Sequence, residues 1–376
     1  MRSGARRSVE VDFIRGVVLI VIAIDHVSGS ALAKFTLHGY AFCDAAEVFV
    51  FLAGYASAAG YDAIAAKHGH DAARLRFVRR SEQIYRAYLV TAGLMLGCGA
   101  LMTALHLHTP MIAQTEWPLF ARQPLAMAGE IASFRHQPYL AAVLPMYAVF
   151  ALCVSVVAPY VRGMPVGTSL VSLAMWLLAP LLGPMLPSAS GTGWGFNPFA
   201  WQLMFVAGML VRLHPVPAAF HASRTGAWLT RISIGIALAF AVTKLALQPQ
   251  PMPGVMKQNL ASIRVIGFAV IAWPVAVMVQ RGWLRGVAQR SRFIVNVGQQ
   301  GVACFVVGAV ASLLIDTALR ASEPHRVPFF AGLAGDVLVF AVLVGTATVA
   351  RRCKRRVAVS RVAETMGADD EMRTIW

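Results

Sequence analysis

Long apolar runs, separated by short polar segments, recur along the whole chain. A helix needs about 20 apolar residues to cross a bilayer, and ten runs approach that length. The pattern predicts an all-α, polytopic integral membrane protein with about ten transmembrane helices. The expected spans are residues 13–33, 42–61, 84–105, 139–160, 168–186, 199–213, 228–247, 262–280, 293–319 and 329–350.

The basic residues predict the orientation of these spans. Most of the 33 lysines and arginines fall in alternate connecting segments and in the tail 351–376. Cytoplasmic segments of membrane proteins carry such an excess, so both termini are expected on the cytoplasmic side. The basic tail then lies beside anionic lipid. We expect one membrane domain over residues 1–376.

Composition excludes several classes of protein. The chain is 58% hydrophobic and only 13% charged, whereas soluble domains are about 25% charged. Its net charge of +16 does not indicate a nucleic-acid partner, because the basic residues lie in short loops between spans. The five cysteines occur singly, so neither a disulfide framework nor a metal site is expected. No tightly bound cofactor is predicted.

Ionisable residues interrupt the first two apolar runs. Asp25 and His26 fall in the first run, and Asp44 and Glu47 fall in the second. Each charge near the bilayer centre costs about 2.5 to 3.5 kcal/mol on insertion scales. Asp44 and Glu47 share a helix face, since they are three positions apart. If the connector after residue 33 turns the chain back, the four side chains form an intramembrane cluster.

His26 is the first candidate for chemistry in this cluster. An imidazole titrates near neutral pH, and a neighbouring carboxylate can fix its tautomer and raise its basicity. We therefore predict that His26 is a general base with Asp25, Asp44 and Glu47 as its acidic neighbours. A structural polar cluster and a proton relay are the alternatives.

A cationic group is expected on the cytoplasmic side of His26. Ten residues separate Arg15 from His26, which places the two on one helix face about 16 Å apart. Arg79, Arg80 and Arg86 precede or open the third span. Guanidinium groups suit phosphates, so these four arginines are predicted to hold a nucleotide-bearing donor. The positive-inside rule explains part of the group without a ligand.

Aromatic and amide groups suggest a sugar site on the outer side. Asn197, Trp201 and Gln202 lie near the outer end of the sixth span, and Lys244 and Arg264 lie at the outer ends of the seventh and eighth. These five residues are candidates for binding an acceptor. The competing interpretations are an interfacial aromatic belt and ion pairing among Lys244, Arg264 and Asp336.

The absence of common motifs narrows the reaction classes. The sequence has no Walker A loop, no GxSxG elbow and no HExxH pair. Phosphate-loop, hydrolase and metalloprotease functions therefore lack their main support.

Four stretches carry a family resemblance: the two quoted next, and RRSEQIYRAYL and VLPMYAVFAL between them. The stretch EVDFIRGVVLIVIAIDHVSGSALAKFTLHGYAFCDAAEVFVFLAGY and the later WGFNPFAWQLMFVAGML resemble the OpgC family of bacterial inner-membrane proteins that acylate periplasmic glucans. The resemblance implies a ten-span enzyme that transfers an acyl group, typically succinyl from succinyl-CoA, to glucan hydroxyls. It also implies that His26 is the base or transient acyl carrier with Asp25 as partner, that Asp44 and Glu47 are the acidic pair, and that the four arginines bind CoA.

The same resemblance shows one departure and leaves several points open. Relatives usually have histidine followed by serine where this chain has Gln300 and Gly301, which puts activity or acyl choice in question. A transporter or acyl-carrier flippase, and a non-enzymatic scaffold, remain as alternative functions. The residues do not decide between succinyl and acetyl donors. The small-residue spacing of Gly54 and Ala58 suits helix packing within or between chains.

Overall fold

The structure is a computed structural model that describes residues 8–107, 111–189, 191, 193–247, 254–322 and 327–374. Every regular element in these ranges is a helix, as predicted. By length and composition, seven of the described helices can cross a membrane. This agrees with a polytopic membrane protein.

The first half of the described chain contains eight α-helices and two short 3-10 helices. In chain order they are α1 (Val9–Asp25), η1 (Ala33–Phe35), α2 (Leu37–Tyr40), α3 (Ala45–Ala104), α4 (Met111–Gln114), α5 (Trp117–Phe120), α6 (Pro124–Ala132), η2 (Tyr139–Ala141), α7 (Val143–Gly163) and α8 (Pro165–Leu182).

The second half adds one 3-10 helix and nine α-helices. They are η3 (Gly183–Met185), α9 (Pro198–Leu213), α10 (Ala218–Ala222), α11 (Arg224–Ala246), α12 (Gly254–Gln258), α13 (Ser262–Gln280), α14 (Trp283–Arg290), α15 (Arg292–Gln299), α16 (Gly301–Ser322) and α17 (Phe329–Thr374).

The first predicted span is shorter than expected. Helix α1 begins at Val9, where the Ser8 hydroxyl accepts a hydrogen bond from the backbone of Val11, and it ends at Asp25. Two buried carboxylates distant in sequence capture the backbone beyond it: Asp316 accepts from the Ser28 N–H at 2.7 Å, and Asp336 accepts from the Ala31 N–H at 3.0 Å. His26 therefore follows the end of α1 instead of lying within a helix.

The second and third predicted spans belong to one helix. Helix α3 runs over 60 residues, and its path is broken at Gly69, which has φ 85° and ψ 168°. That conformation is essentially restricted to glycine. The ninth predicted span, 293–319, in contrast consists of two helices, α15 and α16, which are divided at Gln300.

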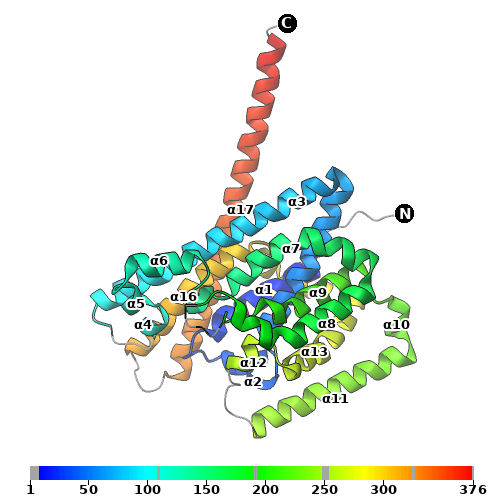
Figure 1. Cartoon of the computed structure of the whole chain (residues 1–376), viewed down its shortest axis with the longest axis horizontal. Coiled ribbons are helices and arrows are strands. Elements are labelled where there is room, and N and C mark those ends of the chain that lie inside the picture. Colours follow the sequence, from blue (N-terminus) through cyan, green and yellow to red (C-terminus); the bar gives the residue numbers. More distant parts are fainter. Residues whose placement is uncertain are drawn as a thin grey trace.

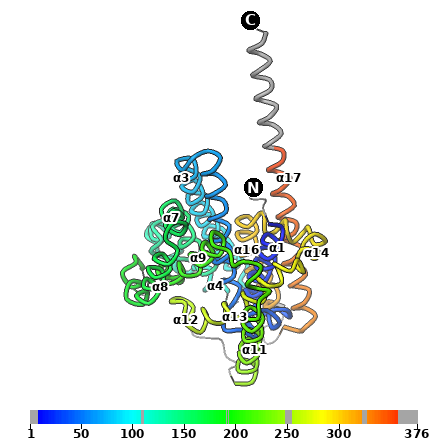
Figure 2. The backbone as a smooth tube through the Cα atoms, turned by 90° about the vertical axis from the view of Figure 1, so that its right-hand side faces the viewer, coloured from blue at the N-terminus to red at the C-terminus, as the bar shows by residue number. Residues whose placement is uncertain are grey.

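The helices form two packed groups, and α1 lies near the middle of the molecule (Figure 1). Figure 2 shows α7, α8 and α9 on one side of the molecule and α1, α14, α16 and α17 on the other. Each side has its own apolar core: one is centred on α3, α7 and α9, and the other on α1, α15, α16 and α17. The end of α1 and the start of α3 lie where the two groups meet, and this junction contains a cavity.

Candidate functional site

The cavity at this junction has a volume of about 170 Å³. Its walls come from both helix groups and from two connecting segments. The lining residues are Ile22, Asp25, His26, His38, Asp44, Ala45, Ala46, Phe49, Tyr139, Leu140, Val143, Tyr147, Phe196, Lys257 and Phe305. Three residues expected in one cluster, Asp25, His26 and Asp44, thus share one cavity, whereas Glu47 does not line it.

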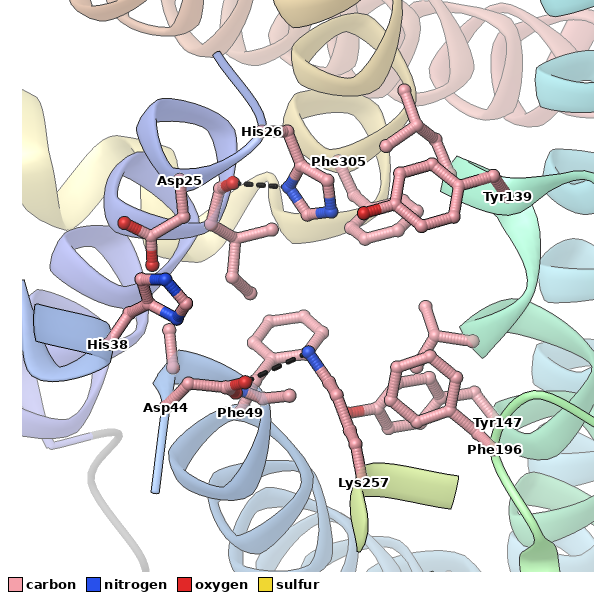
Figure 3. A pocket seen from close by; sticks show the side chains of 15 residues that line it. Asp25, His26, His38, Asp44, Phe49, Tyr139, Tyr147, Phe196, Lys257 and Phe305 are labelled. Atoms are coloured by element: carbon pink, nitrogen blue, oxygen red, sulfur yellow. Dashed lines mark hydrogen bonds and ion pairs between the residues drawn. The ribbon is translucent and has the colours of Figure 1, made fainter. Parts of the chain in front are cut away.

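The His26 ring is oriented by the helix that it follows. Its Nδ1 lies 2.5 Å from the carbonyl oxygen of Ile22. A carbonyl oxygen only accepts hydrogen bonds, so Nδ1 carries the proton and the lone pair of neutral imidazole resides on Nε2. Figure 3 shows the ring projecting into the cavity toward Tyr139, whose ring centroid lies 5.9 Å away. The neutral ring can therefore accept a proton inside the cavity.

Asp25 lies beside His26 in sequence but has a different partner. Its carboxylate accepts a hydrogen bond from the Thr36 hydroxyl at 2.7 Å, while His26 bonds to backbone. Asp25 and His26 line the same cavity (Figure 3). In the described part of the chain no hydrogen bond joins the Asp25 carboxylate to the imidazole, so the His26 tautomer is set by the Ile22 carbonyl.

Asp44 and Glu47 form the start of α3. The Asp44 side chain accepts from the Ala46 N–H at 2.7 Å, and the Glu47 side chain accepts from the Asp44 N–H at 2.9 Å. This is a capping box, which satisfies backbone donors left free at a helix start. Asp44 faces the cavity, but Glu47 is completely buried.

Two cations from distant segments neutralise these acids. Arg264 is 2.5 Å from Glu47 and 3.0 Å from Asp44, and Lys257 is 2.9 Å from Asp44. Arg264, predicted as an acceptor ligand, is itself buried. Lys244, another such candidate, donates to the backbone oxygens of His38 and Ala41, each at 2.6 Å.

The other three candidate acceptor residues lie in the protein interior and contact neighbouring elements. Asn197 caps α9 through the Phe199 N–H and donates to the carbonyl of Ala179. Gln202 exchanges hydrogen bonds with Ser172 on α8. Trp201 is fully buried, and its indole N–H donates to the backbone oxygen of Lys257 at 3.0 Å. Of residues 194–202, Phe196 alone lines the cavity.

Sequence analysis did not select several residues of the cavity wall. They are His38, Tyr139, Tyr147, Phe196 and Lys257. One signal for Lys257 was available, because it is a cation on the predicted outer side, where the positive-inside rule expects few. No local pattern distinguishes the aromatic members from ordinary packing residues.

The cavity cation and the nearby histidine have shifted pKa values. Burial lowers the pKa of Lys257 and the Asp44 carboxylate raises it, with a net upward shift. Burial, followed by the charge of Lys244, lowers the pKa of His38. At neutral pH the cavity therefore contains a protonated lysine and a neutral His38.

The structure separates the four candidate donor-binding arginines. Arg15 lies on α1 close enough to Arg80 for their charges to repel each other. Arg86 is exposed and pairs with Glu82 at 2.5 Å, and Arg79 is also exposed. Residues 79 and 86 share one face of α3, about 100° from Arg80. Arg15 and Arg80 thus lie near each other, whereas Arg79 and Arg86 are on an exposed face of α3.

The departure at residues 300 and 301 lies beside this pair. The Gln300 side-chain oxygen accepts from Lys354 at 2.6 Å. A Cβ added at Gly301 would be 3.4 Å from the Arg15 guanidinium and 3.8 Å from Leu19. A second, smaller cavity of about 20 Å³ extends along this contact, between α1 and α16, to His26.

A comparison with protein families finds one model, described as OpgC protein, that matches residues 7–355. The match therefore covers nearly the whole chain and confirms the resemblance read from the sequence. No curated protein and no solved structure matches the chain.

Proposed function

The chain belongs to the OpgC family, and from this premise we propose that it is an acyl-CoA-dependent O-acyltransferase. Membership of the family suggests a membrane acyltransferase that acts in glucan modification. We propose further that the donor is succinyl-CoA and that the acceptor is a hydroxyl group of a periplasmic glucan. The protein then resides in a bacterial inner membrane, with ten crossings and both termini in the cytoplasm.

The observation that carries the proposal is the hydrogen bond that fixes the tautomer of His26. Its Nδ1 proton is committed to the Ile22 carbonyl, which leaves Nε2 as the acceptor of a proton in a cavity with Asp25, Asp44 and Lys257. A base of this kind contributes about 10² to 10⁴ to a reaction rate. An imidazole with a fixed tautomer, beside a space for a small ligand, is what acyl transfer to a hydroxyl requires.

In the proposed reaction His26 alone takes up the proton and returns it. Nε2 takes the proton of the glucan hydroxyl as its oxygen attacks the thioester carbonyl carbon. The C–S bond then breaks, and the departing sulfur takes the proton back from Nε2, giving an ester and free CoA. The Ile22 carbonyl and the Asp44 carboxylate favour the imidazolium between these two steps. In the alternative route through an acyl-histidine, Nε2 attacks the thioester and expels the CoA thiolate, and the glucan hydroxyl then attacks the acyl carbon. Its proton passes to the thiolate as the C–N bond breaks, which restores neutral His26.

The donor and acceptor are proposed to arrive from opposite sides. The phosphates of CoA lie against Arg15 and Arg80 on the cytoplasmic side, and the thioester arm follows the α1–α16 contact to His26. This route passes the small cavity lined by Leu19, Ile22 and Gly308, whose volume of about 20 Å³ holds about one water, so α1 and α16 must separate when the arm enters. The glucan enters the larger cavity from the periplasm, beside Tyr139 and Phe196. Aromatic side chains of this kind suit the apolar faces of sugar rings.

The test is acyl transfer by purified protein in detergent. Wild-type protein with labelled succinyl-CoA and glucan should release CoA and transfer label to glucan. His26→Ala should lower this rate by about 10² to 10⁴, whereas His68→Ala, at an exposed position of α3, should not change it. A wild-type rate in the His26 variant would contradict the mechanism. A wild-type protein that moves solute without consuming thioester would favour a transporter.

A further inference from the structure

Lys257 is the cation of the cavity wall. Its ammonium group contacts Asp44 at 2.9 Å, and the side chain is 39% exposed where it lines the cavity. Figure 3 shows it across the opening from His26. An ammonium has three donors, so the bond to Asp44 leaves capacity for a ligand.

Buried side chains hold the segment that carries Lys257. The indole of Trp201 donates to the Lys257 carbonyl at 3.0 Å, and the indole of Trp176 donates to the Leu260 carbonyl at 2.8 Å. The Asn197 amide donates to Asn259 at 2.9 Å, and the Gln258 amide donates to the Trp194 carbonyl at 3.0 Å. Helix α12 has only five residues, and these contacts fix its position. The lysine is therefore presented at a defined place.

Tyr147 supplies a second polar group to the cavity. The side chain is 7% exposed, and its hydroxyl is buried with no hydrogen-bond partner in the part of the chain that the structure describes. Buried hydroxyls are normally paired, so an unpaired one requires an explanation. Tyr147 lines the cavity with Lys257, on the side away from Asp25 in Figure 3.

We propose that Lys257 and Tyr147 form a subsite that binds a carboxylate at the far end of the acyl chain. This inference rests on the proposed acyl transfer and assigns the residues that select a dicarboxylic acyl donor. The ammonium and the phenol are both donors, and a carboxylate accepts from both. The thioester carbonyl then lies at His26 and the free carboxylate lies at the opposite wall.

The size of the cavity agrees with this arrangement. Its volume of about 170 Å³ is close to the roughly 150 Å³ of an engineered cavity that admits benzene. A four-carbon acyl group fits such a space, whereas the nucleotide of CoA does not. The nucleotide must remain outside, toward Arg15.

The charges of this wall also suit an incoming anion. Asp44 and Glu47 are matched by Lys257 and Arg264, and Lys244 adds a further cation at the Ala41 carbonyl, three residues before Asp44. Asp25 also lines the cavity, so these carboxylates and cations are equal in number. An incoming carboxylate is therefore favoured beside Lys257 and disfavoured beside Asp25.

The experiment compares two donors that differ in the terminal carboxylate, succinyl-CoA and butyryl-CoA. In Lys257→Met and in Tyr147→Phe, kcat/KM for succinyl-CoA should fall by about tenfold or more, as expected for loss of a hydrogen bond to a charged group. The value for butyryl-CoA should stay within about twofold, and Lys257→Arg should recover part of the succinyl rate. Lys67→Met and Tyr160→Phe, at exposed positions, are the matched controls.

An equal loss for both donors, or no loss for either, would overturn the subsite. Tyr147→Phe removes one oxygen and preserves the ring, so it decides the question even if Lys257→Met does not fold. The wild-type arm reports on the proposed function separately. Wild-type protein that consumes neither donor would remove that function and the subsite with it, whereas turnover without donor discrimination by the variants would remove only the subsite.

Discussion

Asp44 and Glu47 are three residues apart and have different surroundings. Asp44 faces the cavity and contacts Lys257, whereas Glu47 is fully buried against Arg264. Removing one member of a buried ion pair leaves the other charge uncompensated. The main role of Glu47 at the residue scale is thus to hold Arg264 and the start of α3.

This structural role predicts that substitutions at Glu47 and at His26 differ in their effect on stability. Glu47→Ala should lower the stability of the protein by about 3 kcal/mol, because Arg264 stays buried with Asp44 alone. His26→Ala should leave stability close to wild type. Thermal unfolding in detergent measures both, with exposed Asp71→Ala as the control. A Glu47 variant as stable as that control would show that Asp44 alone suffices for Arg264.

At the scale of elements, α3 and α9 cross with their backbones in contact. A Cβ at Gly54 would collide with the Phe205 carbonyl, and a Cβ at Gly208 would collide with the Phe51 carbonyl. Small residues permit such an approach between membrane helices. The predicted packing role of Gly54 is therefore within this chain.

The crossing predicts the effect of one added methyl group. Gly54→Ala should destabilise the protein by about 1 to 3 kcal/mol, since α9 must move. Gly93→Ala lies on the same helix, where no atom is within 4 Å of the added Cβ, and should be neutral or slightly stabilising. Melting temperatures of the two variants in detergent provide the comparison. Equal shifts would contradict the close crossing.

The segment between α3 and α7 has a titratable contact. His136 and Glu116 are 3.5 Å apart, and the Tyr88 hydroxyl donates to the His136 carbonyl at 2.8 Å. The Glu116 carboxylate raises the pKa of His136 above its ordinary value of 6.5, against the effect of burial. Because the folded pKa is the higher one, this contribution to stability is complete below about pH 6.5 and is lost as pH rises through the folded value.

Raising the pH through this range should therefore loosen residues 111–141. Hydrogen exchange of their amides should accelerate beyond its intrinsic pH dependence in wild type, and His136→Gln should remove the additional acceleration. The helices of the bundle, such as α7 and α9, are the internal reference. An identical profile in the variant would assign the pH effect to other groups.

At the scale of the whole molecule, the cavity lies where two helix groups meet, and α1 connects it to Arg15. Helix α1 contacts α15 and α16 in one group and α3 in the other. Ligand sites between the helices of a bundle are common. This position supports the proposed two-sided reaction, in which each substrate approaches along a different face of the junction.

Arg15→Ala tests the donor side. The loss of a guanidinium–phosphate contact should raise KM for acyl-CoA by about tenfold or more, with a smaller change in kcat. In sealed inverted vesicles, acyl-CoA added outside should be consumed only when glucan is enclosed. An unchanged KM would indicate that Arg15 contributes to membrane orientation and not to donor binding. Consumption of acyl-CoA with both substrates on one side would contradict the two-sided arrangement.

The sequence by itself determined the class and much of the helical layout of this protein. Apolar runs are local, and a helix satisfies its own backbone in lipid. The predicted span 262–280 is therefore α13, Ser262–Gln280, to the residue, and the family is confirmed over residues 7–355. The number of crossings and the side of the termini stay predictions.

Only the tertiary structure decided the ends of helices and the composition of the cavity wall. Helix α1 stops at Asp25 because Asp316 and Asp336, some 300 positions away, bind the backbone that follows. Arg264 reaches Glu47 across 217 positions, and Lys257 reaches the cavity because buried indoles and amides hold α12. Such contacts depend on how distant segments pack, and a local pattern of apolar and polar residues contains no record of them.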